Sequence, residues 1–202
     1  MKTRTLLYFG SFNPVHIGHM VIANYVIASG LTDELWFVIS PQNPFKPADS
    51  LVAATERLEM ARMAIEQSGL EERVSATDVE LHLSTPSYTI QTLEALWTAY
   101  PEREFGILMG SDNFACIQKW KEAERILENC PVYVYDRPGF IPSEIPPDLY
   151  NIKRIPDVPL LEISATRLRS LLAEGKYIPA LLPHGVYDYI KEHGLYRIDN
   201  KH

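Results

Sequence analysis

The sequence is poor in cysteine and short of positive charge. Two cysteines, Cys116 and Cys130, occur in 202 residues, and they form neither a C-x-x-C pair nor a cluster of metal ligands. We therefore expect no zinc site, and we expect both side chains to be ordinary buried thiols in a reducing compartment. The formal net charge of -7 argues against a nucleic-acid partner, whose binding surface would need an excess of basic residues.

Long hydrophobic runs are also missing. No apolar run approaches the ~20 residues of a membrane-spanning helix, so no membrane partner is expected. The apolar run near the N-terminus has only about five residues, against the ~7–15 of a secretory signal, which favours a cytoplasmic location. With 46% hydrophobic residues, the chain is expected to form one domain over residues 1–202, with a helical C-terminal part at about 163–195.

Short apolar runs alternate with helical patterns along the chain. This alternation predicts a Rossmann-like α/β fold, with a doubly wound, mainly parallel sheet and helices on both faces. Gly30 and Gly69 are expected to end helices in the left-handed conformation, and Thr55 is expected to cap the helix that follows it. The expected strands are residues 5–9, 34–40, 74–76, 105–109, 132–135 and 152–155.

The stretch YFGSFNPVHIGHM, residues 8–20, places His16 and His19 where the first strand is expected to turn into a helix. The first amides of a helix have no partner within it and the helix dipole is positive there, so this position suits an anion such as phosphate. Two histidines could also ligate a metal, but a closed site usually needs four donors and no partner motif is visible. A helix cap is the alternative for a lone histidine. The small and turn-forming residues around the pair favour a ligand close to the backbone; they are Gly10, Ser11, Asn13, Pro14 and Gly18.

A second motif, ISATRLR at residues 163–169, repeats this arrangement. Ser164 and Thr166 can cap a helix and offer hydroxyls, and Arg169 can reach the same helix end with a bidentate guanidinium. Taken alone, each residue is better explained as a plain cap or a solvated side chain. Together with the histidines they predict a second anion-binding end that faces the first. The G-x-G-x-x-G pattern of dinucleotide-binding oxidoreductases is absent after the first strand.

The two motifs together resemble the (H/T)xGH and ISSTxxR signatures of the nucleotidylyltransferase superfamily. Further stretches resemble the bacterial nicotinate mononucleotide adenylyltransferases, in the expected order and over nearly the whole chain. This resemblance implies transfer of the adenylyl group of ATP to nicotinate mononucleotide in NAD biosynthesis, with release of pyrophosphate. The substrates would be small molecules, and Mg²⁺ would be bound mainly through the ATP phosphates and not by a protein metal site. The further stretches are NPFKP, ERLEM, TPSYTIQTL, MGSDNFACIQKW, DRPGF and LLPHGVYDYIKEHGLY.

The resemblance also implies which residues act on the phosphates. His19 would lie nearest the reacting α-phosphate, with His16 beside it, while Gly18 would leave space for the nucleotide. Ser164, Thr166 and Arg169 would hold the β- and γ-phosphates, which leave as pyrophosphate. The implied catalytic residues are His16, His19, Lys46 and Arg169; the implied ATP-binding residues are Gly10, Ser11, Phe12, Gly18, Gly110, Asp112, Arg137, Ser164 and Thr166.

The same resemblance places the nicotinate pocket in two segments. Thr85 and Tyr88 would line it, and Trp120 would stack on the pyridine ring. Pattern alone favours a core position for Trp120, because Phe114 and Ile117 accompany it, and Tyr88 could equally be a packing residue.

Some positions depart from the family pattern. Asn13 stands where many relatives have Asp, Phe45 precedes Lys46 where a histidine is commoner, and Ala165 replaces a serine. Two alternatives stay open: a sister enzyme that uses nicotinamide mononucleotide, and a non-catalytic nucleotide-binding regulator of the same fold. The sequence leaves the oligomeric state open, a homo-oligomer included.

The implied reaction needs no covalent enzyme intermediate and no general base, because a phosphate monoester is already an anionic nucleophile. The protein must align two polyanions and neutralise the charge that moves to the leaving group. By the switch-point rule, we expect the site at the carboxyl ends of the first and fourth strands, where the opening motif and residues 109–112 would meet.

Overall fold

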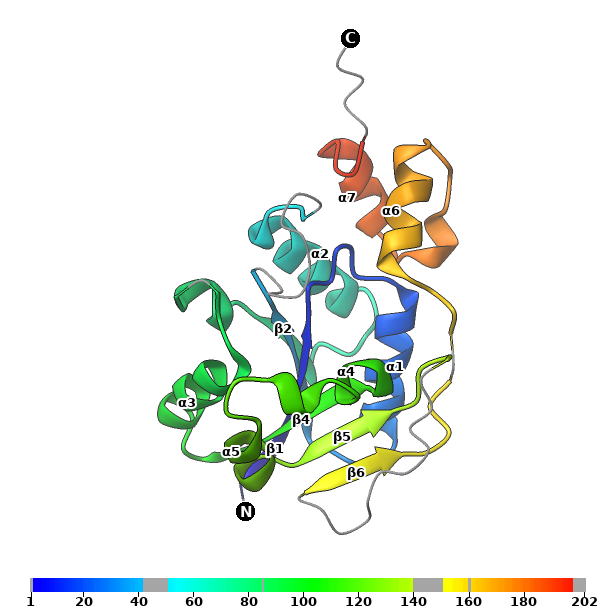
Figure 1. Ribbon diagram of the computed structural model, residues 1–202. Helices are drawn as coiled ribbons and strands as arrows, with labels where there is room; N and C mark the ends of the chain where they lie inside the picture. Colours follow the sequence, from blue (N-terminus) through cyan, green and yellow to red (C-terminus); the bar gives the residue numbers. More distant parts are fainter. Residues whose placement is uncertain (1, 42–50, 85, 140–150, 160, 198–202) are drawn as a thin grey trace.

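The computed structural model of the protein describes residues 2–41, 51–84, 86–139, 151–159 and 161–197, and Figure 1 shows its arrangement. One six-stranded sheet has the strand order β3-β2-β1-β4-β5-β6, and every neighbouring pair is parallel. This order is that of the doubly wound nucleotide-binding fold, so the α/β prediction is confirmed. The strands are β1 (Thr3–Gly10), β2 (Glu34–Ile39), β3 (Val74–Thr77), β4 (Arg103–Gly110), β5 (Val132–Tyr135) and β6 (Ile152–Ile155).

Helices connect the strands and continue beyond the last one. In the described residues, no helix combines the length and the apolar character that crossing a bilayer requires. The α-helices are α1 (Ile17–Ala28), α2 (Ala54–Glu66), α3 (Thr89–Ala99), α4 (Ser111–Phe114), α5 (Ala123–Asn129), α6 (Ala165–Ala173) and α7 (Val186–Glu192). Short 3-10 turns are η2 (Val79–His82), η3 (Ile117–Lys119) and η4 (Pro179–Leu181).

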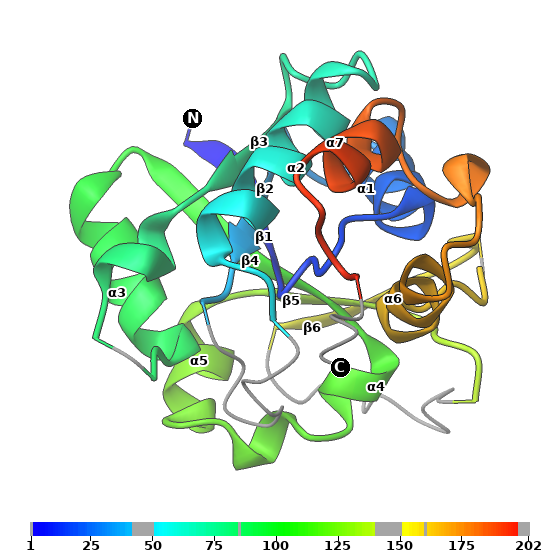
Figure 2. The same ribbon diagram turned by 90° about the horizontal axis from the view of Figure 1, so that it is seen from above.

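The core lies on both faces of the sheet, because successive side chains of a strand point to opposite faces. Leu6 and Tyr8 of β1 pack with residues of α1, α2, α6 and α7, whereas Leu7 packs with residues of α3 and α5. Figures 1 and 2 show these two groups of helices on opposite sides of the sheet. The near-continuous apolar sequence of the central strands follows from this two-sided burial.

The two predicted glycine caps are confirmed, and the predicted cap of α2 is wrong. Gly30 and Gly69 have φ angles of 70° and 69°, as expected for left-handed residues just after helices. Thr55 is not the cap of α2: Ala53 holds that position, and the Arg57 amide donates to the Ala53 carbonyl at 3.1 Å. The Arg57 side chain also bonds to the carbonyl of Val52, just before the helix, at 2.9 Å.

The two cysteines differ in exposure, so the expectation of two buried thiols is wrong for one of them. Cys130 is buried, its thiol donates to the Phe105 carbonyl at 3.3 Å, and burial raises its pKa to about 12. Cys116 is exposed, because it lies in the surface turn between α4 and η3.

The strand order reverses between β1 and β4, which lie side by side with Tyr8 opposite Leu108. Parallel strands end at the same edge of a sheet, so Gly10 and Gly110 bring their following loops together there. The opening motif and residues 109–112 therefore meet where the sequence predicted.

Candidate active site

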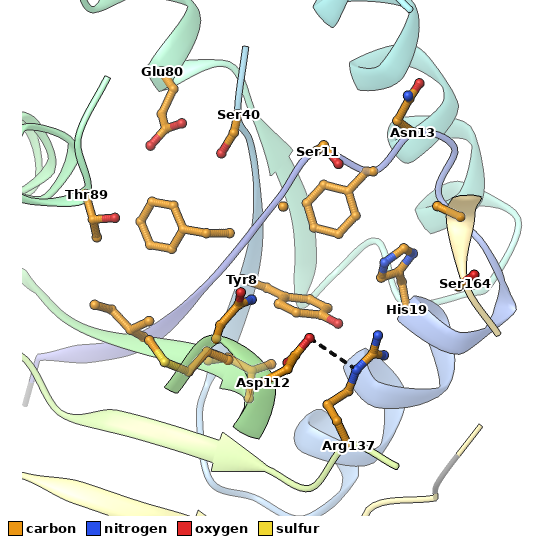
Figure 3. A pocket seen from close by; sticks show the side chains of 18 of the residues that line it. Tyr8, Ser11, Asn13, His19, Ser40, Glu80, Thr89, Asp112, Arg137 and Ser164 are labelled. Atoms are coloured by element: carbon orange, nitrogen blue, oxygen red, sulfur yellow. Dashed lines mark ion pairs between the residues drawn. The ribbon is translucent and has the colours of Figure 1, made fainter. Parts of the chain in front are cut away.

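A cleft of about 650 Å³ opens at the carboxyl ends of β1 and β4. It joins side chains from segments far apart in the sequence: the loop after β1, the start of α1, the end of β4 and the start of α6. Figure 3 shows His19, Ser164, Asp112 and Arg137 toward one end and Ser40, Glu80 and Thr89 toward the other. The predicted residues that line it are Gly10, Ser11, Phe12, His16, His19, Tyr88, Asp112, Trp120, Arg137, Ser164, Thr166 and Arg169.

The two histidines form one unit at the N-terminus of α1. His16 is the residue before the helix, its amide donates to Nδ1 of His19 at 3.2 Å, and the two rings stack with centroids 3.7 Å apart. Because Nδ1 of His19 accepts this bond, the neutral ring carries its proton on Nε2. The capping bond thus fixes His19 as a hydrogen-bond donor through the nitrogen farther from the backbone.

His16 is almost completely buried, with 3% of its surface exposed. Burial, with a smaller contribution from the charge of Arg137, lowers its pKa to about 4, so the ring is neutral at pH 7. Its Nδ1 has no hydrogen-bond partner among the described residues. This nitrogen lies against Gly18, at the start of α1.

The second motif forms the facing wall. Ser164 caps α6, since its hydroxyl accepts a bond from the Arg167 amide at 3.2 Å, as the sequence predicts. Arg169 donates to the carbonyl oxygen of Asn13 at 2.8 Å and to the Thr166 hydroxyl at 3.3 Å. The α6 arginine is therefore attached to the loop that leads into α1, which brings the N-terminal ends of the two helices together.

Asp112 and Arg137 form a third group of side chains, at the same end of the cleft as the histidines and Ser164. Arg137 Nε lies 3.8 Å from Asp112 Oδ2, and the Arg137 amide donates to the Ser111 hydroxyl at 2.9 Å. Gly110 makes this approach possible, because a Cβ there would lie 2.5 Å from Asp112 Oδ1 and 2.8 Å from Arg137 Cγ. The guanidinium provides a positive charge beside the histidines.

The opposite end of the cleft contains Glu80 and the residues around Tyr88. Glu80 is buried and accepts hydrogen bonds from the hydroxyls of Thr92, at 2.8 Å, and Ser87, at 3.3 Å. Burial raises its pKa, and the hydroxyl bonds oppose that shift. The carboxylate thus ties η2 to the start of α3, where Tyr88 lies.

Trp120 and Lys121 lie on the wall near Tyr88. Trp120 is half-buried: it packs on the core beside β4 and also lines the cleft. Trp120 therefore combines the core packing that its pattern predicts with a place on the cleft wall. Lys121 also lines the cleft, with its ammonium 4.6 Å from the centre of the Tyr88 ring.

Residues 7–171 match the model of the cytidylyltransferase-like family. A Bacteroides fragilis protein named "Probable nicotinate-nucleotide adenylyltransferase" is 44% identical over 191 residues, covering 94% of this chain and 92% of the relative. A Flavobacterium johnsoniae protein of the same name is 39% identical, covering 95% of this chain and 97% of the relative. The chain belongs to the nicotinate-nucleotide adenylyltransferases.

Solved structures support the fold of this family member. The Plasmodium falciparum nicotinic acid mononucleotide adenylyltransferase complexed with NaAD superposes with a TM-score of 0.78 at 22% identity, covering 96% of this chain and 97% of that chain. The same enzyme complexed with APC gives a TM-score of 0.77. The helices after β6 are thus part of a known architecture.

Four predicted site residues of this adenylyltransferase do not line the described cleft. Lys46 and Thr85 lie outside the described residues. Gly110 lies behind Asp112, and Gly18 lies behind His16, where a Cβ would be 3.0 Å from His16 Nδ1. Gly18 was expected to leave space for the nucleotide; in the structure its missing side chain makes room for the His16 ring.

Arg57 was not predicted to have a role near the site. Its side chain is fully buried and donates to the carbonyls of Val52, Ser11, Ser40 and Pro41, at 2.9 Å for Val52, 2.8 Å for Ser40 and 3.0 Å for Pro41. It thereby joins the loops that follow β1 and β2. The available signal was its spacing, since positions 57, 61 and 64 share the apolar face of α2.

The sequence also gave no sign of a tyrosine pair in the cleft floor. The hydroxyls of Tyr8 and Tyr135 lie 2.8 Å apart, both residues are 5% exposed, and burial raises both pKa values. Tyr8 and Tyr135 looked like ordinary strand residues, because nothing in a sequence pattern shows that β1 and β5 end beside the same cleft.

Proposed function

We propose that the protein transfers the adenylyl group of ATP to nicotinate mononucleotide and releases pyrophosphate. The observation that carries this proposal is the junction of two anion-binding helix ends in one cleft: His16 and His19 at α1, and Ser164 and Arg169 at α6, joined through Asn13. Such a cleft suits a substrate with a chain of phosphates. The family membership of the chain gives the reaction its chemical class.

The chemistry we propose is a direct displacement at the α-phosphorus. A 5′-phosphate oxygen of nicotinate mononucleotide forms the new bond to phosphorus, and the bond to the bridging oxygen breaks, so pyrophosphate leaves with the electron pair. His19 donates from Nε2 to the α-phosphate, while Arg169, Thr166 and Ser164 bind the leaving phosphates. The protein contributes alignment and charge, and no protein group is adenylylated.

We propose that Mg²⁺ enters with ATP. The part of the chain that the structure describes has no group of three or more His, Cys, Asp or Glu side chains arranged to hold a metal. Mg²⁺ commonly keeps its waters and binds through substrate phosphates with one or two carboxylates, and Asp112 lines the cleft at the phosphate end. The ion would neutralise charge on the phosphates.

The end of the cleft around Tyr88 and Trp120 suits an acceptor whose ring has an acidic substituent. Lys119 and Lys121 flank Trp120 on the cleft wall, so positive charge lies near the ring platform. A carboxylate gains from this potential and an amide gains much less, which favours nicotinate over nicotinamide. The lysines are features of this wall that the sequence alone did not assign to a ligand.

The experiment that tests the function compares acceptors side by side. Purified protein with ATP and Mg²⁺ is given nicotinate mononucleotide, nicotinamide mononucleotide or phosphopantetheine, and pyrophosphate release is measured. We expect a strong preference for nicotinate mononucleotide, reduced in Lys121→Gln. Preference for another acceptor would keep the phosphate chemistry but overturn the roles of Tyr88 and Trp120. Silence with all three in folded protein would favour a nucleotide-binding regulator.

A further inference from the structure

The segment after α7 returns to the cleft and contacts the loop that follows β1. The Tyr196 hydroxyl donates to Asn13 Oδ1 at 2.8 Å, across a sequence separation of 183 residues. Figure 2 shows this segment running over that loop. Tyr196 has a φ of 60°, a left-handed conformation that costs a non-glycine residue energy, so surrounding contacts must maintain it.

Asn13 is the point where three parts of the structure meet. It is 1% exposed, and its side-chain oxygen accepts bonds from the Tyr196 hydroxyl and, at 3.4 Å, from the Val52 amide. Its backbone oxygen accepts the 2.8 Å bond from Arg169. The Tyr196 hydroxyl and Arg169 therefore bind the side chain and the backbone of the same residue, in the turn that leads to His16.

We infer that Tyr196 is a positioning residue for the adenylyl transfer proposed above, on which this inference rests. Tyr196 is not among the described residues that line the cleft, so it acts through Asn13 and not on the substrate. Its hydroxyl fixes the turn at residues 11–15, and with it the relative placement of the two anion-binding ends. The segment after α7 thereby helps to position the residues proposed to bind the phosphates.

The ring and the hydroxyl of Tyr196 make separable contributions. The ring packs against the core cluster that contains α1, α2 and α7, and phenylalanine preserves that contact. The substitution Tyr196→Phe keeps the ring and removes the hydroxyl that bonds to Asn13 Oδ1. A small misplacement of phosphate-binding groups affects the transition state more than the folded structure.

The chain offers a matched control in Tyr189. Its hydroxyl donates to Glu56 Oε2 at 2.7 Å, so it also joins the C-terminal part to α2, but it does not line the cleft. We expect Tyr196→Phe to lower kcat/KM for ATP by roughly tenfold, the equivalent of one hydrogen bond. Tyr189→Phe should leave kcat/KM unchanged, although it should lower the melting temperature about as much as Tyr196→Phe does.

A double-mutant cycle tests whether Tyr196 acts through Asn13. In an Asn13→Ala background, Tyr196→Phe should change kcat/KM by less than about twofold, because the acceptor is already gone. Independent effects of the two substitutions would overturn the inference. So would full activity of Tyr196→Phe, or equal losses in Tyr196→Phe and Tyr189→Phe.

Amide hydrogen exchange separates this inference from the proposed function, because it requires no turnover. We expect Tyr196→Phe to speed exchange in the peptide covering residues 11–19, and Tyr189→Phe to leave it unchanged. If the wild-type protein transfers no adenylyl group, the proposed function fails, and faster exchange would still show that Tyr196 holds this turn. Unchanged exchange in Tyr196→Phe would overturn the positioning role.

Discussion

At the scale of single residues, the two histidines at the start of α1 differ in their surroundings. His16 is buried and neutral, and its amide fixes the tautomer of His19. His19 lines the cleft, and its Nε2 is the nitrogen that carries the proton of the neutral ring. The stacked arrangement explains the spacing of three residues, which places the second ring over the first at the start of one helix.

The role of His19 predicts a large loss of turnover with little loss of stability. His19→Ala should lower kcat by roughly 10²–10³, the usual effect of removing one transition-state donor. Steady-state pyrophosphate release gives kcat, and thermal unfolding shows whether the variant is folded. A folded His19→Ala protein with full turnover would refute the role.

The burial of His16 predicts a pH-dependent stability. Because its pKa falls from 6.5 to about 4 on folding, the unfolded chain binds the proton first as the pH drops. The stabilisation is complete above about pH 6.5 and is lost as the pH falls toward 4, by about 3 kcal/mol at most.

Urea unfolding of the wild type and His16→Gln at pH 7.5, 6, 5 and about 4 measures this contribution. The free-energy difference between the two proteins should shrink as the pH falls, since glutamine binds no proton. A difference that is constant over this range would show that His16 is not held neutral by the fold.

At the scale of elements, α2 has a second task beyond covering the sheet. Its fully buried Arg57 bonds to carbonyls of the loops after β1 and β2, and no carboxylate pairs with it among the described residues. The guanidinium therefore serves to satisfy backbone acceptors that would otherwise be buried without partners.

Replacement of Arg57 should destabilise the protein strongly. Arg57→Met keeps much of the side-chain volume but leaves several buried carbonyls unsatisfied, so the free energy of unfolding should fall by about 3 kcal/mol. Arg62→Met on the exposed side of the same helix should change it by less than about 0.5 kcal/mol. Urea unfolding compares the two variants, and equal losses would contradict the assigned role of Arg57.

The elements themselves were largely predictable, for a physical reason. Strands buried on both faces, such as β1 and β4, are continuous apolar runs, and Gly30 and Gly69 mark helix ends through their left-handed conformation. The start of α2 was not predictable, because no side chain caps it: Ala53, which makes no side-chain capping bond, holds the cap position.

At the scale of the whole molecule, the site depends on contacts that local patterns do not record. The motifs at residues 8–20 and 163–169 indicated two anion-binding ends, and the strand order brings them to one cleft. The bond between Tyr196 and Asn13, and the pairing of Tyr8 with Tyr135, join residues more than a hundred positions apart. Such contacts follow from the completed fold and not from any window of sequence.

The overall charge and the local charge of the cleft also have opposite signs. The chain carries a formal charge of -7, yet Arg137, Arg169, Lys119 and Lys121 line the cleft. Nearby cations and helix ends, and not the net charge, determine where a polyanion binds. The molecule is therefore suited to a small phosphorylated substrate.

Identification of the product tests directly whether the protein transfers the adenylyl group of ATP to nicotinate mononucleotide. Protein, ATP, Mg²⁺ and nicotinate mononucleotide are incubated together, and nicotinate adenine dinucleotide and pyrophosphate are quantified by mass spectrometry and an enzymatic assay. Direct transfer predicts one dinucleotide for each pyrophosphate released. Release of pyrophosphate with AMP and no dinucleotide would mean that water is the acceptor, and it would contradict the account.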